Sequence, residues 1–324
     1  MITTILVLSL FIASPSLSFA KVFKRNTVLM GTDIELTASD TDEDRVNAAF
    51  DAAIQEMDRI ENEMSEWRDG TPVSIINQKA GIEPVSVPQE LLNVISAAQK
   101  VSQLSDGAFD ISWAAMRGIW NFAKGKERIP TPEEIKEKLP LINYKYIEID
   151  EGKKTVILKK KGMAMGLGAI AKGYAVDKAM QVMVIRGIKN AIVKAGGDMR
   201  IQGTQDGKPW DIGIRHPRDK TKLLGMLTLS NISISTSGDY ERYFIKDGIL
   251  YHHIMDPKTG YPALACQSVT ILAPDTMTSD ALSTAVFVLG PDKGMKLIKS
   301  LPGIEGIIVD SNGGVHYSPG ISNK

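Results

Sequence analysis

Hydrophobic residues recur every three or four positions in the first third of the chain, and this period is typical of amphipathic helices. A helix is predicted over residues 44–64, with Thr41 as its N-cap. A second helix is predicted from Pro88 to the turn signal Asp106-Gly107. Thr131 and Glu134 have the spacing of a capping box, which predicts a short third helix ending near Leu139.

Short alternating or continuous apolar runs dominate the second half of the chain and predict strands. These strands are expected at 191–193, 210–214, 226–235, 240–245, 250–255 and 268–273. Hairpins are expected at 146–159 and around Asn312-Gly313, and helices at 168–186, 278–289 and 292–300. Strands that follow strands, with helices grouped rather than interleaved, predict an α+β fold of antiparallel sheets in one compact unit.

The amino-acid composition argues against some classes of function but does not indicate a particular one. The 324 residues are 43% hydrophobic and carry 38 basic and 38 acidic side chains. This balance favours neither a nucleic-acid-binding surface nor a disordered acidic tail. The single cysteine, Cys266, excludes a disulfide within the chain and is expected to be a buried apolar residue beside a strand.

The N-terminus has the pattern of a secretory signal peptide. An apolar run over residues 5–13 precedes Ser18-Phe19-Ala20, a small-x-small peptidase site. Cleavage is expected after Ala20, which leaves residues 21–324 as the mature domain in the periplasm. The apolar run is too short to span a membrane, no other segment resembles a transmembrane helix, and no cysteine follows the cleavage site to carry a lipid anchor.

Gly166 to Gly173 (GLGAIAKG) lies where a strand-like segment changes into a helix. Small residues let backbone amides approach an anion, the helix N-terminus is electropositive, and Lys172 adds a full positive charge. The segment could therefore bind phosphate. Glycine before a helix is common, however, and the segment matches neither the Rossmann nor the Walker spacing, so this pattern alone is also compatible with a purely structural turn.

Asp280 and Thr284 lie four residues apart and share one face of a predicted helix. Their oxygen atoms suit magnesium, which takes few protein ligands and leaves its other positions to water and phosphate. A structural explanation fits the spacing equally well, because Asp280 would favour a helix N-terminus and Thr284 could bond to the preceding turn.

Two histidines and two aromatic residues complete the set of candidates. His252 and His253 are adjacent in a strand-like segment, so one imidazole can face a cleft and serve as a base while the other is structural. Trp67 and Phe109 adjoin polar, flexible segments and could stack on a planar ring. Ordinary core packing is the alternative for each of them.

Six segments, taken in their order along the chain, resemble the ApbE family of FAD:protein FMN transferases. They are Met30-Gly31-Thr32, Met64 to Arg68 (MSEWR), Ser105 to Asp110 (SDGAFD), Gly168 to Asp177 (GAIAKGYAVD), the pair Ser237 to Phe244 and Tyr251 to Gly260 (SGDYERYF and YHHIMDPKTG), and Thr278 to Gly290 (TSDALSTAVFVLG).

The resemblance implies a T-fold-like α+β domain that uses Mg²⁺ and FAD and passes FMN to a threonine or serine hydroxyl of an acceptor flavoprotein, releasing AMP. It implies His253 and Lys172 as catalytic residues, and Asp177 as a support for the loop. The implied metal ligands are Ala169, Asp280 and Thr284. The implied FAD-binding residues are Met30, Trp67, Ala108, Phe109, Asp110, Lys172 and Ile254.

The chain departs from the family pattern at two positions, and two other functions stay open. Gly166 stands where family members usually have aspartate, and Ala169 where glycine is usual. An FAD pyrophosphatase would use water in place of the acceptor hydroxyl, although related hydrolases lack an aromatic residue at the position of Trp67. A non-catalytic periplasmic FAD-binding protein is the third hypothesis, which the loss of aspartate at Gly166 favours.

Overall fold

An eight-stranded antiparallel sheet organises the computed structural model, which describes residues 20–322. The strand order is β1-β2-β6-β7-β10-β13-β14-β15. These strands are β1 (Lys21–Leu29), β2 (Thr32–Asp40), β6 (Ala191–Ala195), β7 (Asp198–Gln202), β10 (Ile232–Gly238), β13 (Cys266–Ala273), β14 (Glu305–Asp310) and β15 (Val315–Tyr317). All eight residues of β13 are buried, so the centre of the sheet is covered on both faces.

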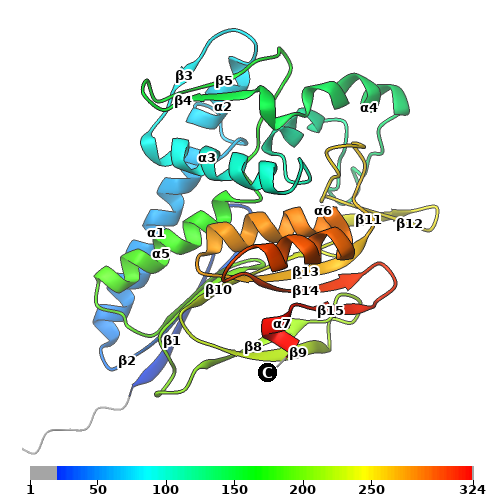
Figure 1. The fold of residues 1–324 in the computed structure, drawn as a ribbon. Helices are drawn as coiled ribbons and strands as arrows, with labels where there is room; N and C mark the ends of the chain where they lie inside the picture. The colour runs from blue at the N-terminus through cyan, green and yellow to red at the C-terminus, as the bar shows by residue number, and fades with distance from the viewer. Residues whose placement is uncertain (1–19, 323–324) are drawn as a thin grey trace, which may run out of the picture.

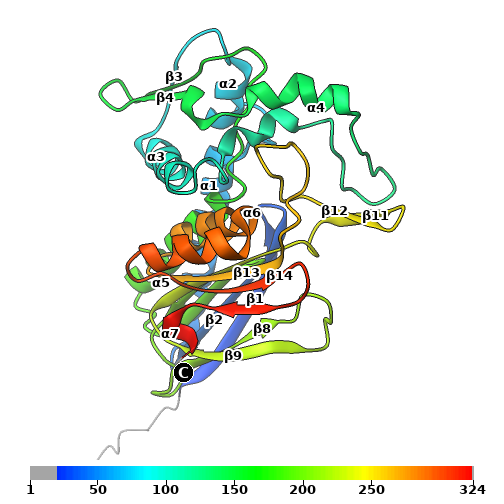
Figure 2. The ribbon, with the colours of Figure 1, turned by 45° about the vertical axis from the view of Figure 1, so that its right-hand side comes forward.

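Three long helices cover one face of this sheet (Figure 1). They are α1 (Glu43–Met64), α5 (Ala171–Ile185) and α6 (Thr276–Ser300). Their apolar stripes form the main core with the sheet, where Phe50, Met57 and Phe287 are fully buried. The opposite face packs against the hairpin β8 (Trp210–Arg215) and β9 (Leu223–Leu229) through a second cluster around Trp210 and Ile212 (Figure 2).

A smaller layer lies on the far side of the helices from the sheet (Figure 1). It contains α2 (Pro72–Gln78), α3 (Gln89–Leu104), η1 (Ile111–Met116), α4 (Pro132–Lys138), η2 (Leu139–Leu141), η3 (Tyr144–Tyr146) and the sheet of β3 (Val85–Ser86), β5 (Thr155–Leu158) and β4 (Ile147–Asp150). The hairpin β11 (Tyr243–Lys246) and β12 (Ile249–His252) projects beside this layer, and α7 (Pro319–Ser322) ends the described chain.

The predicted helices are confirmed with small changes at their ends. The N-cap of α1 is Asp42 and not Thr41, because the Asp42 carboxylate accepts the hydrogen bond of Arg45 N. Thr131 and Glu134 form the expected capping box of α4. The two predicted C-terminal helices are the two arms of α6, which kinks at Gly290 (φ 78°) before Pro291.

The predicted strand over 226–235 is wrong, because Asn231 has a positive φ of 53° and separates β9 from β10. The sequence pattern also does not indicate β1, an edge strand that is exposed or half-exposed along its whole length, as well as β2, β7 and α2. Cys266 is buried, as expected. The predicted signal peptide falls almost wholly outside residues 20–322, and within that range no helix has the length and apolarity needed to cross a bilayer.

Candidate functional site

Several turns and helix segments of the candidate site meet at one end of the large sheet. The Met30-Gly31 turn joins β1 to β2, and the Gly196-Gly197 turn joins β6 to β7. The pairing of β2 with β6, and of β10 with β7 and β13, brings both turns and Gly238 to this same end. The first turn of α5 lies at this end, where Lys172 contacts Asp198. The segment of α6 around Thr284 also lies there, where Ser283 and Thr284 contact Ser237.

Lys172, Asp198 and Asp280 form a buried charged group at this end, which we call the lysine cluster. The Lys172 Nζ atom lies 2.7 Å from Asp198 Oδ2 and 3.6 Å from Asp280 Oδ2. Asp280 Oδ2 also accepts a hydrogen bond of 3.0 Å from Gly173 N, in the first turn of α5. Both aspartates are only 3% exposed, so their charges depend on these contacts rather than on water.

Burial and charge act in opposite directions within the lysine cluster. Burial disfavours the charged form of Lys172, but Asp198 and Asp280 outweigh it and hold the pKa of Lys172 above its ordinary value. Burial and the nearby Asp198 raise the pKa of Asp280 above its ordinary value, against the pull of Lys172. A further cation beside Asp280 would favour its ionised form.

Thr284 lies one helical turn after Asp280 on α6, as the four-residue spacing predicts. Its hydroxyl is 3.3 Å from Ser237 Oγ on β10, and Ser237 Oγ is 2.8 Å from Ser283 Oγ. Ser235 Oγ and Ser279 Oγ form a similar contact of 2.7 Å one turn earlier. This row of hydroxyl contacts fixes the helical face that carries Asp280 and Thr284 against β10.

The donor chemistry of this face fits a hard divalent cation. Among residues 20–322 no three His, Cys, Asp or Glu side chains are grouped to hold a metal ion. Asp280 and Thr284 supply a buried carboxylate and a hydroxyl, and the half-buried Ala169 brings a backbone carbonyl just before α5. Magnesium accepts such a sparse set of oxygen ligands and keeps water or phosphate oxygens at its other positions.

The two adjacent histidines have different environments. His252 is fully buried, with Nε2 2.8 Å from the Ala263 carbonyl and Nδ1 accepting a hydrogen bond of 3.3 Å from Ile254 N. Both of its ring nitrogens are therefore used in the structure. His253 is only partly buried as a residue, but its Nδ1 is buried and has no hydrogen-bond partner within residues 20–322. Of the two, His253 has the nitrogen available for a ligand.

Positive charge surrounds His253. Burial, and then the charges of Arg242, His252 and Lys172, lower the pKa of His253 to about 3, so its imidazole is neutral at pH 7. His253 N donates a hydrogen bond to the Arg242 carbonyl, and Arg242 Nη2 donates one of 3.1 Å to the Gly31 carbonyl. These bonds connect the Met30-Gly31 turn with His253 and place cationic groups where an anionic ligand would be stabilised.

Met30 and Ile254 lie near this centre, but their polar backbone groups have structural partners. Met30 has a positive φ of 53°, and its N–H donates to Glu61 Oε2 at 3.0 Å. Ile254 is buried, and its carbonyl accepts a hydrogen bond from Ala263 N. Glu61 also pairs with Arg68, which ties the Met30 turn to the residues around Trp67.

The segment Ala108 to Asp110 is buried and largely structural. Asp110 accepts hydrogen bonds from Ser112 N, Ser112 Oγ and Tyr144 N at 2.6–2.8 Å. Burial raises the pKa of this carboxyl despite those bonds. The Phe109 ring is only 2% exposed and belongs to the main core, so the core-packing alternative holds for it. Any contact of Phe109 with FAD would have to use backbone atoms.

Trp67 is the opposite case, with 69% of its surface exposed. The guanidinium carbon of Arg117 lies 4.1 Å from the centre of its ring, a cation–π arrangement. Arg117 is in turn held by Glu66, through the Glu66 carbonyl and an ion pair of 3.1 Å. One face of the indole is thereby supported, and much of the side chain is open to a planar ligand.

The structure also shows what occupies the space beside Gly166. A Cβ atom added to Gly166 would lie 2.8 Å from Glu66 Oε1 and 3.2 Å from Ala114 Cβ. Gly166 N donates a hydrogen bond to the Ile111 carbonyl, one residue after Asp110. Glycine at this position therefore allows the Trp67 segment, the Asp110 segment and the loop before α5 to pack together.

Asp198 and Arg117 belong to this region but were not among the predicted site residues, and Asp177 was predicted to support the loop. Asp198 has the shortest contact with Lys172, and an acidic residue directly after Gly196-Gly197 was the available signal. Arg117, which supports Trp67, had no signal in the sequence. Asp177 accepts hydrogen bonds from Thr276 N and Met277 N at 2.8–2.9 Å, so it stabilises the start of α6.

Comparison with known proteins gives one consistent result. The ApbE family model matches residues 30–308. A FAD:protein FMN transferase of Treponema pallidum (strain Nichols) is 33% identical over 295 residues, covering 86% of this chain and 82% of that protein.

Solved structures agree with the family match. The ApbE protein of Thermotoga maritima has a TM-score of 0.86 and 37% identity, covering 94% of this chain and 99% of that one. The flavin transferase ApbE of Vibrio cholerae has a TM-score of 0.82 and 27% identity over the same shares. The predicted α+β fold is therefore confirmed.

Proposed function

The chain belongs to the ApbE family and is a FAD:protein FMN transferase, and we propose that it transfers FMN with Mg²⁺ to a threonine or serine hydroxyl of an acceptor protein, releasing AMP. The family resemblance drawn from the six motifs is confirmed by the family match and by the relatives. The observation that carries the proposal is the lysine cluster beside a neutral His253 with a buried, unpartnered Nδ1.

In the proposed reaction the acceptor oxygen forms a new bond to the phosphorus of the FMN half of FAD. The bond between that phosphorus and the bridging oxygen of the pyrophosphate breaks, and AMP leaves with the bridging oxygen. Phosphoryl transfer of this kind depends mainly on positioning and on neutralising charge. Lys172 and Arg242 supply fixed positive charge near His253, on the side where the pyrophosphate would lie.

Asp280, Thr284 and the Ala169 carbonyl would hold the Mg²⁺ ion. When bound, Mg²⁺ would supply positive charge that offsets the charge of the phosphates. The Asp280 carboxylate has to be ionised for this role, and Lys172 and Gly173 N favour that state. The hydrogen bonds of Ser237 and Ser283 keep this face of α6 in place.

His253 would accept the proton of the acceptor hydroxyl. Its pKa of about 3 ensures that the imidazole is unprotonated before substrate binds, but it also makes the free imidazole a weak base. Binding of an anionic pyrophosphate would offset the charges of Arg242 and Lys172 and thus raise the pKa of His253. The base would therefore become stronger when FAD is present.

Trp67 would stack on the isoalloxazine ring, with Arg117 supporting the indole from the other side. Its presence favours transfer over hydrolysis, because related hydrolases lack an aromatic residue at this position. The N-terminal segment 1–20 would direct the enzyme to the periplasm, where the acceptor would then also be located.

The test uses residues 21–324 with FAD, with Mg²⁺ or with EDTA, and with a protein extract of the source organism. Covalent flavin is read as fluorescence of protein bands in a denaturing gel, and AMP is read by chromatography. The proposal expects a fluorescent acceptor band and AMP with Mg²⁺ only. AMP and free FMN without any acceptor would show a pyrophosphatase instead, and intact FAD in all samples would show a binding protein.

A further inference from the structure

The hairpin β11–β12 carries a free strand edge that leads directly to His253. The two-residue turn Asp247-Gly248 has positive φ at both positions (53° and 76°), which is typical of a tight hairpin turn. Arg242 and His253 stand at the base of the hairpin and are joined by the bond from His253 N to the Arg242 carbonyl. Beyond them the hairpin extends away from the body of the protein (Figure 2).

The register of the hairpin determines which backbone groups are free. Lys246 pairs with Ile249 across the two-residue turn, and Phe244 pairs with Tyr251 two positions further on. Hydrogen-bonded pairs alternate in an antiparallel ladder, so the N–H and C=O groups of Tyr243 and Ile245 point away from β12. Within residues 20–322 these outward groups have no backbone partner.

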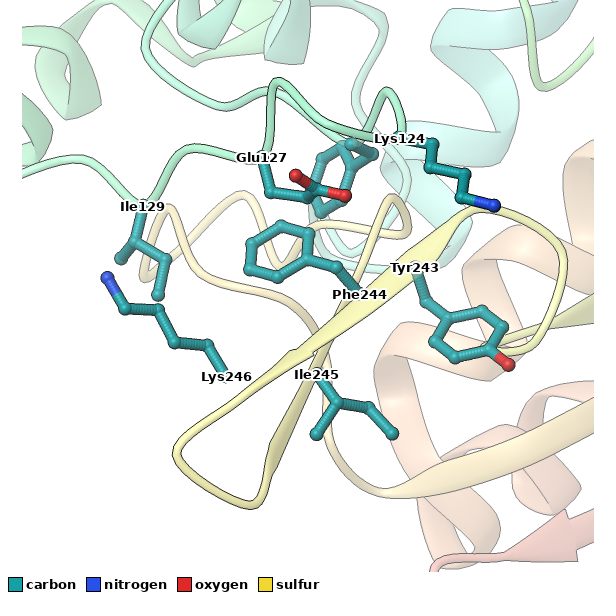
Figure 3. A pocket seen from close by; sticks show the side chains of 8 residues that line it. Lys124, Glu127, Ile129, Tyr243, Phe244, Ile245 and Lys246 are labelled. Carbon is teal, nitrogen blue, oxygen red and sulfur yellow. The ribbon is translucent and has the colours of Figure 1, made fainter.

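A groove of about 560 Å³ runs along this free edge. Its floor and walls come from all four residues of β11 and, on the other side, from Phe122, Lys124, Glu127 and Ile129. Phe244 extends toward the loop that carries Glu127, whereas Ile245 extends to the opposite side of the strand (Figure 3). An added strand would therefore find backbone partners and side-chain surface on both faces.

The hairpin is stabilised on one face and exposed on the other. Phe244 and Tyr251 stack with ring centres 5.4 Å apart, and both continue into the aromatic group of Trp120 and Phe122. Ile245 is 65% exposed and Tyr243 is 41% exposed. A rigid strand with unpaired backbone groups and exposed apolar side chains is a template for pairing with another chain.

We propose that this edge binds an extended segment of the acceptor protein, which adds to β11 as a third strand. The inference rests on the proposed function, because a transferase must hold the acceptor hydroxyl at His253. The segment would be apolar and uncharged or acidic, since Lys124 and Lys246 outnumber Glu127 along the groove. The modified residue would follow the paired segment beyond Tyr243, where β11 begins next to Arg242 and its hydrogen-bonded neighbour His253.

The chain offers a matched pair of variants for this proposal. Ile245→Pro removes an N–H that points into the groove, whereas Leu250→Pro, at the paired position of β12, removes an N–H on the opposite edge. Ile245→Glu is a second variant that places a negative charge on the free edge, which would repel an acidic segment and disfavour an apolar one, and it leaves every backbone bond intact. The probe is the acceptor protein that becomes fluorescent with the wild-type enzyme in the assay above.

The proposal expects Ile245→Pro and Ile245→Glu to lower kcat/KM for the acceptor at least tenfold. FAD binding, measured by flavin fluorescence, should be unchanged, and Leu250→Pro should be close to wild type. Amide exchange at Tyr243 and Ile245 should slow when an acceptor whose modified hydroxyl residue is replaced by alanine is added. Equal losses in both proline variants, or no loss in either Ile245 variant, would overturn it.

Two other experimental outcomes would each contradict a different part of the proposal. If Ile245→Glu changes the sedimentation of the free enzyme, the edge joins two copies of this chain and the acceptor proposal fails. If the wild-type enzyme labels no protein at all, the proposed function fails before the hairpin is tested. Loss of acceptor transfer with retained FAD binding distinguishes the docking proposal from both results.

Discussion

Side chains of the lysine cluster and the side chain of Trp67 are held in position by different kinds of contact. Lys172, Asp198 and Asp280 are held by one another and by Gly173 N inside the protein. Trp67 is mostly exposed and is supported mainly by the guanidinium of Arg117. The charged half of the site is therefore rigid before FAD binds, and the aromatic half is an open surface. This difference predicts that substitutions in the charged half affect turnover, whereas those in the aromatic half affect substrate binding.

The largest effect is expected from Asp280→Asn, which preserves shape but removes the buried negative charge. We expect FMN transfer to fall by about 10³-fold and the Mg²⁺ concentration needed for half-maximal rate to rise. Asp275→Asn is the matched control on the same helix, because asparagine keeps the N-cap bond to Thr278 N. An Asp280→Asn enzyme with normal turnover would remove the lysine cluster from the mechanism.

The second-largest effect is expected from His253. The same substitution, histidine to glutamine, should lower turnover at His253 but lower stability at His252. His253→Gln should lower kcat by about 10²-fold with little change in thermal stability. His252→Gln should instead lower the free energy of unfolding by about 1–3 kcal/mol, because it disrupts two buried hydrogen bonds. Steady-state kinetics and thermal unfolding of the two variants check this division, and a loss of kcat confined to His252→Gln would reverse the assignment.

The pH dependence of stability follows from the lowered histidine pKa. His253 has a pKa of about 3 when folded and about 6.5 when unfolded, so the unfolded chain binds the proton first. The free energy of unfolding should therefore fall as pH drops below about 6.5, by up to about 1.4 kcal/mol per pH unit for this group. Urea unfolding from pH 7 to pH 5 should show a smaller slope for His253→Gln than for the wild type; identical slopes would contradict the assignment.

The smallest effect is expected from substitutions of the exposed residue Trp67. Trp67→Ala should raise KM for FAD by up to about tenfold, because one aromatic stacking contact contributes about 0.5–1.5 kcal/mol. Trp67→Phe should keep most of the affinity, and neither change should alter thermal stability. If Trp67→Ala left FAD binding intact but lowered kcat, the indole would act on transfer itself and the division between the two halves would fail.

The fold could be predicted where periodicity and caps were strong. The helix over 44–64 and the Thr131 capping box are present because apolar spacing and local hydrogen bonds determine them. The edge strand β1 could not be recognised, because it has no buried face to impose a clear alternation. The break at Asn231 depends on a positive φ, which an asparagine permits but does not require.

Only the site residues that lie in recognisable sequence motifs could be predicted. The four-residue spacing of Asp280 and Thr284 predicts that they share one face of a helix, and in the structure both lie on one face of α6. Asp198 and Arg117 depend on long-range packing, since Asp198 meets Lys172 across 26 positions and Arg117 meets Glu66 across 51. Strand alternation alone could not decide between His252 and His253, and the family resemblance pointed to His253. In the structure both ring nitrogens of His252 have partners.

The central claim is that these residues join FMN to a protein and release AMP. FAD labelled with ³²P in the phosphate of its FMN half tests it most directly, with the acceptor identified by fluorescence. The account predicts one protein-bound label for each AMP formed, and none of either with Asp280→Asn. Label that appears in free FMN in proportion to AMP, with none bound to protein, would contradict it.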